Sequence, residues 1–328
     1  MSFKHSPKIS IVIPVYNEEG NISAIIDKID TVFQSIDDIN YEIIFVDDGS
    51  TDETLPVLIS LCLTKTNVFY ISFSRNFGKD NALIAGFKCA TGDALITIDA
   101  DLQHPPNMIP EFIHWWQKGF DIVYAYRKDK NIHAGFFTRV RSRLFYKVIS
   151  AFSDVKMENG ISDYKLIDKK VIEVINKLPE DKPFLRGLLK WVGFKQKAVE
   201  YEPCERYSGA TKYSLISLIK LATQGLTSFS TKPLTFAIYL GFFYSATSLL
   251  YIPYVLISLY YHLQRPGWAS VIVTIAFFGG LQLMIMGIIG LYLGKTFIQS
   301  KHRPRYIVQS SNLDVNKELV LHKSYDSF

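Results

Sequence analysis

Two aspartates separated by a single alanine are the residues of this 328-residue chain whose spacing most suggests chemistry. Asp99 and Asp101 follow an apolar run, residues 94–98, that predicts a short buried strand, and a double proline then stops the strand from continuing. Residues two apart in an extended chain project to the same side, so both carboxylates can face one point. A hard divalent ion such as Mg²⁺ or Mn²⁺ would suit such a pair. A solvated acidic turn is the alternative when the pair is considered alone.

Short apolar runs alternate with helical periodicity over the first 126 residues. The pattern predicts strands at residues 9–14, 41–46, 68–73, 94–98 and 121–126, with helices between them. Ser50 and Glu53 have the spacing of a capping box for the helix that runs to about Leu63. Strands that alternate with helices indicate an α/β domain with a mostly parallel sheet.

Polar and acidic residues stand at the carboxyl ends of three of these predicted strands, where ligands bind in such sheets. The three sets are Tyr16 with Glu18, Asp47 with Asp48, and Asp99 with Asp101. Three separate clusters on one rim favour a ligand site over a solvated turn. Neither a G-x-G-x-x-G loop nor a P-loop is present, so metal and basic side chains must bind the phosphates of any nucleotide.

Two basic stretches accompany the acidic rim. One runs from Arg127 to Arg143, and the other is a Gly/Ser-containing loop that carries Arg206 and Lys212. This loop could be ordinary surface, or it could be a lid that neutralises a diphosphate when it closes. The net charge of +5 is modest and no basic aromatic repeat is present, so we do not expect a nucleic-acid partner.

The C-terminal third is strongly apolar. No Asp, Glu, Lys or Arg occurs between Lys232 and Arg265, or between Arg265 and Lys295, and each gap exceeds the roughly 20 residues that cross a bilayer as a helix. We therefore expect two transmembrane helices, at about 234–262 and 269–294, joined as a hairpin. Leucine and isoleucine recur at helical spacing in residues 214–230, which indicates a helix in the membrane interface or a plain core helix.

The expected domain order follows from these patterns. It consists of a catalytic domain at 1–213, juxtamembrane amphipathic helices at 214–232, a transmembrane region at 233–297 and a tail at 298–328. Basic residues follow the second span with no acid before Asp314, which places the tail in the cytoplasm by the positive-inside rule. An even number of spans then places the large N-terminal domain there too. Small residues such as Gly287 and Gly290 would permit a homo-oligomer through the helices.

Four motifs in a fixed order carry a resemblance to a known family. They are Pro14 to Glu18, Val46 to Asp52, Arg75 to Lys79 and Asp99 to Gln103. In this order they resemble family 2 glycosyltransferases, and more narrowly the polyprenyl-phosphate glycosyltransferases. The resemblance implies a GT-A catalytic domain with a Rossmann-like, mostly parallel sheet, followed by an interfacial helix and a two-helix transmembrane hairpin.

The resemblance also implies roles for individual positions. The family's nucleoside-binding positions match Pro14, Tyr16, Glu18 and Asp48, and we expect the adjacent Asp47 to take part in this binding. Ligands of Mg²⁺ or Mn²⁺ match Asp99, Asp101 and Gln103, and basic positions around the phosphates match Arg127, Arg206 and Lys212. Asp163 matches a position near the reacting centre. Its role could be that of a base, an orienting group or a structural carboxylate. His104 departs from a usual Asp, and Lys165 from a usual Arg, a change that keeps the charge but loses bidentate phosphate geometry.

The implied reaction is inverting, metal-dependent transfer of a sugar from a nucleotide-sugar to an undecaprenyl (bactoprenol) phosphate, for cell-envelope glycan or lipopolysaccharide modification. UDP-glucose is the expected donor, with GDP-mannose and UDP-N-acetylglucosamine as alternatives. A processive polysaccharide synthase would carry a Gln-x-x-Arg-Trp motif, which the surroundings of Trp191 lack. The alternative that is not an enzyme is a membrane scaffold with a degenerate catalytic domain. Such a domain would be expected to lack one of the three acidic sets, and this chain has all three.

Overall fold

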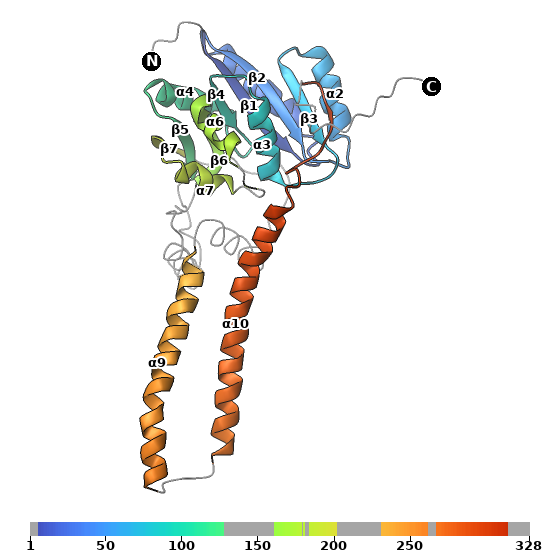
Figure 1. Cartoon of the computed structure of the whole chain (residues 1–328). Helices are drawn as coiled ribbons and strands as arrows, with labels where there is room; N and C mark the ends of the chain where they lie inside the picture. Colours follow the sequence, from blue (N-terminus) through green and yellow to red (C-terminus); the bar gives the residue numbers. More distant parts are fainter. Residues whose placement is uncertain are drawn as a thin grey trace, which may run out of the picture. The chain divides into compact units, whose positions relative to one another are not determined.

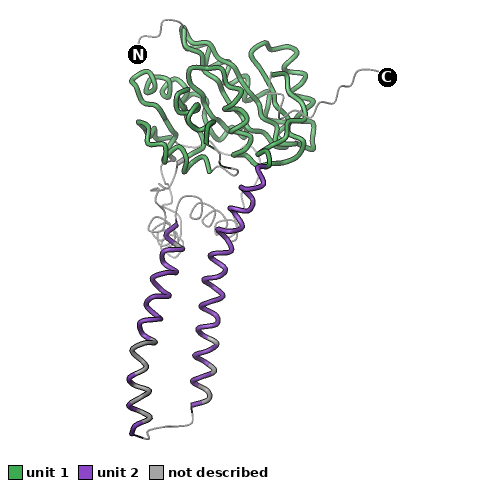
Figure 2. Tube along the Cα trace, viewed as in Figure 1, with its two compact units in different colours: residues 1–138, 157–212, 303–328 green, residues 139–156, 213–302 purple. Residues whose placement is uncertain are grey.

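The computed structural model describes residues 6–127, 161–178, 180, 184–201, 231–261 and 267–313. The chain forms two compact units (Figure 2). The first contains residues 1–138, 157–212 and 303–328, and the second contains 139–156 and 213–302. The candidate lid residues Arg206 and Lys212 and the expected interfacial segment 214–230 lie outside the described residues.

An eight-stranded sheet forms the centre of the first unit (Figure 1). Its order in space is β7 (Gln196–Tyr201), β5 (Ile122–Arg127), β6 (Ile161–Asp168), β4 (Ala94–Thr97), β1 (Lys8–Val15), β2 (Asn40–Asp47), β3 (Val68–Phe73) and β8 (Val308–Ser311). The strands β6 and β8 run antiparallel to the others, which makes the described sheet mostly parallel, as predicted.

Helices cover both faces of this sheet. On one face lie α1 (Ile22–Gln34), α2 (Thr54–Thr64) and the pair η1 (Pro106–Met108) and α4 (Ile109–Gln117). On the other face lie α3 (Lys79–Cys89), α6 (Lys169–Lys177) and α7 (Leu185–Trp191) (Figure 1). Each face has its own hydrophobic cluster because successive strand residues point to opposite sides.

The central strand β1 shows this alternation directly. Ile9, Ile11 and Ile13 pack with α1 and α4, whereas Val12 packs with α3, and all four are fully buried. A Cβ atom at Gly86 of α3 would lie 2.3 Å from Val12 Cγ1, so glycine lets α3 approach β1 closely. This packing fixes the start of α3 beside the carboxyl ends of β1 and β4.

The chain returns to the first unit after its last long helix. There β8 pairs antiparallel with β3, and Tyr306, 2% exposed, stacks on Phe73 with ring centroids 4.8 Å apart. The Arg305 guanidinium donates to the carbonyl of Leu178. The segment expected as a tail from residue 298 therefore contains a strand of the catalytic sheet.

Two long helices dominate the second unit, α9 (Lys232–Tyr260) and α10 (Trp268–Ser300). Within α10, residues 273–300 are long and apolar enough to cross a membrane, with a mean hydropathy of 2.0. In α9 a shorter apolar stretch, Leu234–Thr247, stands out among the described residues. Among the described residues one helix is thus both long and apolar enough, and a two-helix transmembrane hairpin is not established.

Candidate active site

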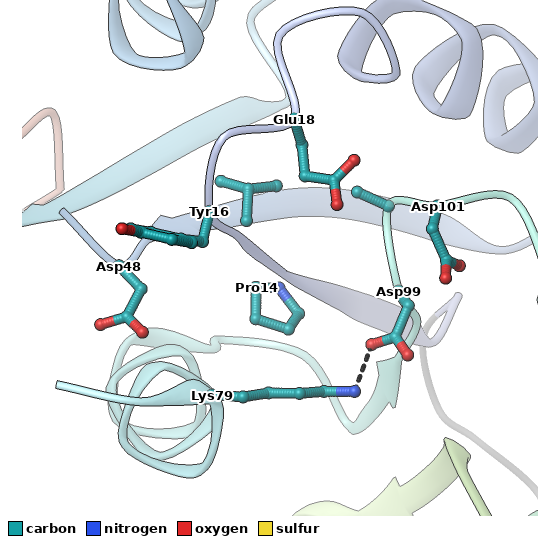
Figure 3. A pocket seen from close by; sticks show the side chains of 9 residues that line it. Pro14, Tyr16, Glu18, Asp48, Lys79, Asp99 and Asp101 are labelled. Atoms are coloured by element: carbon teal, nitrogen blue, oxygen red, sulfur yellow. Dashed lines mark ion pairs between the residues drawn. The ribbon is translucent and has the colours of Figure 1, made fainter. Parts of the chain in front are cut away.

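A cavity of about 230 Å³ opens where β1, β2 and β4 reach their carboxyl ends (Figure 3). Strand order reverses between β4 and β1, and open α/β sheets bind ligands at such a reversal. The lining residues are Pro14, Val15, Tyr16, Glu18, Asp48, Lys79, Asp99, Ala100 and Asp101. Six residues predicted from three separate stretches of sequence therefore meet in one place.

Asp99 and Asp101 lie in a turn rather than in the strand. The strand β4 ends at Thr97, one residue earlier than expected, and Leu102 takes a left-handed conformation with φ of 60°. The Asp101 carboxylate accepts a hydrogen bond from the Gln103 backbone N–H at 3.1 Å, which stabilises the turn. Both residues line the cavity, and Figure 3 shows the Asp99 carboxylate directed toward Lys79.

His104 supports this turn from beneath. Its Nδ1 accepts a hydrogen bond from the Asp99 backbone N–H at 3.3 Å, so the ring proton lies on Nε2, which is 2.7 Å from Ser162 Oγ. Burial lowers the pKa of His104, which favours this neutral form. The departure from the usual Asp therefore has a structural consequence, because His104 positions the backbone of Asp99.

Asp48 joins the nucleoside side of the cavity to the loop before α3. Its carboxylate accepts hydrogen bonds from the backbone N–H groups of Phe77, at 2.6 Å, and Gly78, at 2.9 Å. Gly78 has φ of 99°, a conformation that favours glycine. Burial raises the pKa of the Asp48 carboxyl. Asp48 thus lines the cavity and also orients the loop that leads to Lys79.

Asp47 does not line the cavity with its neighbour Asp48. It is 1% exposed, and its two oxygens accept from the Ser50 backbone N–H at 3.0 Å and from Ser72 Oγ at 2.7 Å. The expected contact between Asp47 and a nucleoside is contradicted by this burial, because both oxygens already bind the protein. The capping box was also wrong: α2 begins at Thr54, and Ser50 Oγ instead accepts from the backbone N–H of Asn17.

A second group of charges surrounds Asp163. Arg186 binds its carboxylate with two hydrogen bonds, from Nε at 2.7 Å and from Nη2 at 2.8 Å, and Lys79 Nζ lies 3.1 Å from Oδ2. Burial alone would raise the pKa of Asp163, but the hydrogen bond from Arg186 and the charge of Lys79 hold it well below its usual range. This carboxylate stays ionised and paired.

Sequence reasoning assigned no role to Arg186 or Lys79. Arg186 is an isolated cation 23 residues from Asp163, and only the packing of α7 near the end of β6 brings them together. Lys79 belongs to the motif from Arg75 to Lys79, but nothing in a single sequence indicates that it contacts Asp99.

Lys165 is buried beside this group rather than placed for phosphates. Lys165 is 5% exposed. Burial lowers its pKa to about 8, although the nearby Asp163 carboxylate acts to raise it. Its charge lies with those of Asp163, Arg186 and Asp80.

The donor set fits a divalent ion that a substrate helps to bind. Asp99 and Asp101 offer hard oxygen ligands on one wall of the cavity. Among the described residues no cluster of three or more His, Cys, Asp or Glu side chains could hold a metal by itself. Gln103 is not among the residues that line the cavity. Arg127 is the last residue of β5, and its side chain lies outside the described part of the structure. A metal here would need oxygen atoms from a bound diphosphate.

Residues 10–175 match the family model described as Glycosyl transferase family 2. The chain belongs to this family. It is 42% identical over 311 residues to "Uncharacterized glycosyltransferase YkcC" of Bacillus subtilis (strain 168), covering 94% of this chain and 96% of the relative. It is 41% identical over 304 residues to "Bactoprenol glucosyl transferase" of Shigella phage SfV, covering 92% and 98%. The resemblance inferred from the four motifs is thereby confirmed.

Family membership establishes that this protein is a glycosyltransferase, with the GT-A type of α/β sheet described above. A solved structure of glucosyl-3-phosphoglycerate synthase from Mycobacterium tuberculosis, in complex with Mn²⁺, UDP-glucose and phosphoglyceric acid, is 19% identical with a TM-score of 0.46. It covers 67% of this chain and 78% of that chain. This distant likeness adds nothing to the assignment.

Proposed function

We propose that this enzyme transfers a sugar, with inversion, from a nucleotide-sugar to a polyprenyl phosphate in the membrane, using Mg²⁺ or Mn²⁺. UDP-glucose is the proposed donor. The observation that carries the proposal is the cavity in which Asp99 and Asp101 face Tyr16 and Asp48 at a strand-order reversal. The near full-length similarity to a phage protein named bactoprenol glucosyl transferase supports the lipid acceptor.

The chain's own residues would divide the work as follows. Tyr16 and Asp48 bind the nucleoside, Asp99 and Asp101 hold the metal at the diphosphate, and Lys79 adds a positive charge beside them. When bound, the metal supplies Lewis-acid stabilisation of the charge that develops on the departing diphosphate. We retain Arg127, Arg206 and Lys212 as proposed phosphate contacts on the family resemblance alone.

Asp163 is better suited to positioning than to proton transfer. A general base works best with a pKa near the operating pH, whereas the pKa of Asp163 is held well below its usual range. The acceptor phosphate has its second pKa near 6 and is largely ionised at neutral pH, so it needs little help from a base. We propose that Asp163 aligns Lys79 and Arg186 at the reacting centre.

The membrane topology is a second part of the proposal. Both β3 and β8 belong to one sheet, so the chain leaves and re-enters the same domain and must cross a membrane an even number of times. If α10 crosses, as its apolar residues 273–300 suggest, we infer that α9 is the second crossing. Basic residues at the end of α10 and after it, among them Lys295, Lys301 and Arg303, favour a cytoplasmic catalytic domain.

The experiment is a transfer assay on membranes that contain the full-length protein. Radiolabelled UDP-glucose, UDP-N-acetylglucosamine and GDP-mannose are supplied in parallel with polyprenyl phosphate, and the extracted lipids are counted. We expect one donor to label the lipid, and we expect Asp99→Asn and Asp101→Asn to lower the rate about a hundredfold or more, since metal stabilisation is worth several kcal/mol.

The matched control is Asp27→Asn, an exposed aspartate of α1 that does not line the cavity. It should keep the wild-type rate. Absence of labelled lipid with every donor would contradict the acceptor and favour a scaffold role. An unchanged rate in Asp99→Asn would contradict the metal assignment.

A further inference from the structure

Lys79 bridges two carboxylates at the floor of the cavity. Its Nζ lies 2.6 Å from Asp99 Oδ1 (Figure 3). It also lies 3.1 Å from Asp163 Oδ2. Asp163 is already bound by Arg186 through two hydrogen bonds. In the described part of the chain, the ion pair of Asp99 is with Lys79, and the neutral ring of His104 lies 3.6 Å from its other oxygen. Lys79 therefore supplies the positive charge that balances Asp99.

The placement of Lys79 is not explained by the stability of its helix. It is the first residue of α3, where the helix dipole disfavours a cation. The loop before it is held instead by Asp48, which accepts hydrogen bonds from the N–H groups of Phe77 and Gly78. The same carboxylate that lines the nucleoside side of the cavity thus fixes the base of the Lys79 side chain.

The Lys79 ammonium and a divalent ion would compete for the same oxygen. A bound Mg²⁺ requires its ligand oxygen at about 2.1 Å and a near-ideal octahedral shell. An ammonium 2.6 Å from Asp99 Oδ1 fills part of that shell and repels a second cation. The side chain of Lys79 is 40% exposed, and a flexible four-carbon stem lets it leave Asp99 while it keeps its contact with Asp163.

We propose that Lys79 is a resident counter-ion of the metal site. Its ammonium holds Asp99 until a divalent ion binds, and it then moves from Asp99 toward Asp163 and the donor phosphates. The metal alone then binds weakly, and it binds well only together with a nucleoside diphosphate, whose negative charge attracts both cations. This inference rests on the metal assignment made under the proposed function.

The test measures binding of Mn²⁺ to the full-length protein in detergent by electron paramagnetic resonance, with and without UDP. Wild type is compared with Lys79→Met, which keeps the stem without the charge, and with Lys79→Arg, which keeps a charge. Lys28→Met, on the exposed side of α1, is the matched control. A second neutral variant, Lys79→Gln, is measured alongside in case Lys79→Met does not fold.

We expect Lys79→Met to bind Mn²⁺ alone about tenfold more tightly than wild type, because a like charge beside the site has been removed. The gain in Mn²⁺ affinity on adding UDP should shrink in the same variant, whereas Lys79→Arg and Lys28→Met should resemble wild type. The inference is overturned if both neutral variants bind Mn²⁺ no more tightly than wild type while Asp99→Asn abolishes binding. If Asp99→Asn leaves Mn²⁺ binding with UDP unchanged, the metal assignment itself fails, and the inference fails with it.

Discussion

The Tyr306 side chain offers a direct test of whether the segment after α10 is part of the catalytic sheet. Its ring is 2% exposed and stacks on Phe73 at an interplanar angle of 14°. Truncating a buried aromatic residue to alanine typically costs about 3–5 kcal/mol, and the stacked pair adds to this. Since β8 has only four residues at the sheet edge, we take about 3 kcal/mol for Tyr306→Ala.

That loss converts to a shift in the melting temperature. A domain of 150–250 residues loses about 2–4 °C per kcal/mol, so Tyr306→Ala should lower the Tm by about 6–12 °C. The assay is thermal unfolding of the full-length protein in detergent, at one scan rate for all variants. Tyr306→Phe keeps the stacked ring and should change little, as should Leu63→Ala at a position that is 84% exposed.

Limited proteolysis provides an independent measurement of the same perturbation. Release of β8 should make trypsin cut faster after Lys301 and Arg305, which precede the strand. A Tm shift below about 2 °C in Tyr306→Ala, with no change in the rate of cleavage, would refute the assignment of this segment to the sheet. An even number of membrane crossings would then no longer follow from the pairing of β8 with β3.

Four further outcomes follow from the site and the proposed topology. Asp163→Asn and Arg186→Met should each lower kcat, and the double variant should be no worse than the poorer single variant, because the two groups form one unit. The ratio of the wild-type rate to the Asp163→Asn rate should also be constant between about pH 6 and 8, since the pKa of Asp163 lies well below that range; a ratio that changes with pH would indicate proton transfer. Lys165 has a pKa of about 8 when folded and 10.5 when unfolded, so the unfolded chain binds more protons between these values and wild-type stability should rise there with pH. Lys165→Met should lack this rise and should melt at a higher temperature than wild type at pH 7, whereas the control Lys28→Met should show neither effect. Removal of divalent ions with EDTA should abolish the thermal stabilisation by UDP, and Mn²⁺ should restore it; stabilisation that survives EDTA would contradict a shared metal and diphosphate site. Gly267→Cys, between α9 and α10, should react with an impermeant maleimide added outside intact cells, and protection at this position would contradict the proposed hairpin.

Local patterns predicted the parts of the fold that depend on local physics. The apolar runs at β1, β2 and β3 give strands because their residues are buried on both faces of a parallel sheet. Parallel strands bring their carboxyl ends to one edge, so the sequence alone predicts that Tyr16, Asp48 and Asp99 lie close together. The pattern could not distinguish Asp47 from Asp48, because successive residues at a strand end face opposite ways and only the packing decides which one is buried.

Contacts between distant segments were beyond this reasoning. The pair Asp163–Arg186 depends on where α7 packs, and the pair Lys79–Asp99 depends on how closely α3 approaches β1. The strand β8 was missed for a related reason, since four residues after a long apolar helix carry too little periodicity to indicate a strand. Its pairing with β3 is a property of the folded sheet rather than of its own sequence.

The balance of charge in the cavity supports the proposed roles of Lys79 and of a divalent ion. The lining carries four carboxylates, Glu18, Asp48, Asp99 and Asp101, and one ammonium, Lys79, which gives a net charge of −4 + 1 = −3 when all are ionised. A diphosphate brings further negative charge, so the described cavity would repel the donor that the family requires. Lys79 balances one carboxylate, and a divalent ion held by Asp99 and Asp101 would supply further positive charge for the phosphates. The acidic rim therefore supports the proposed metal, and the metal and the nucleotide would stabilise each other in the site.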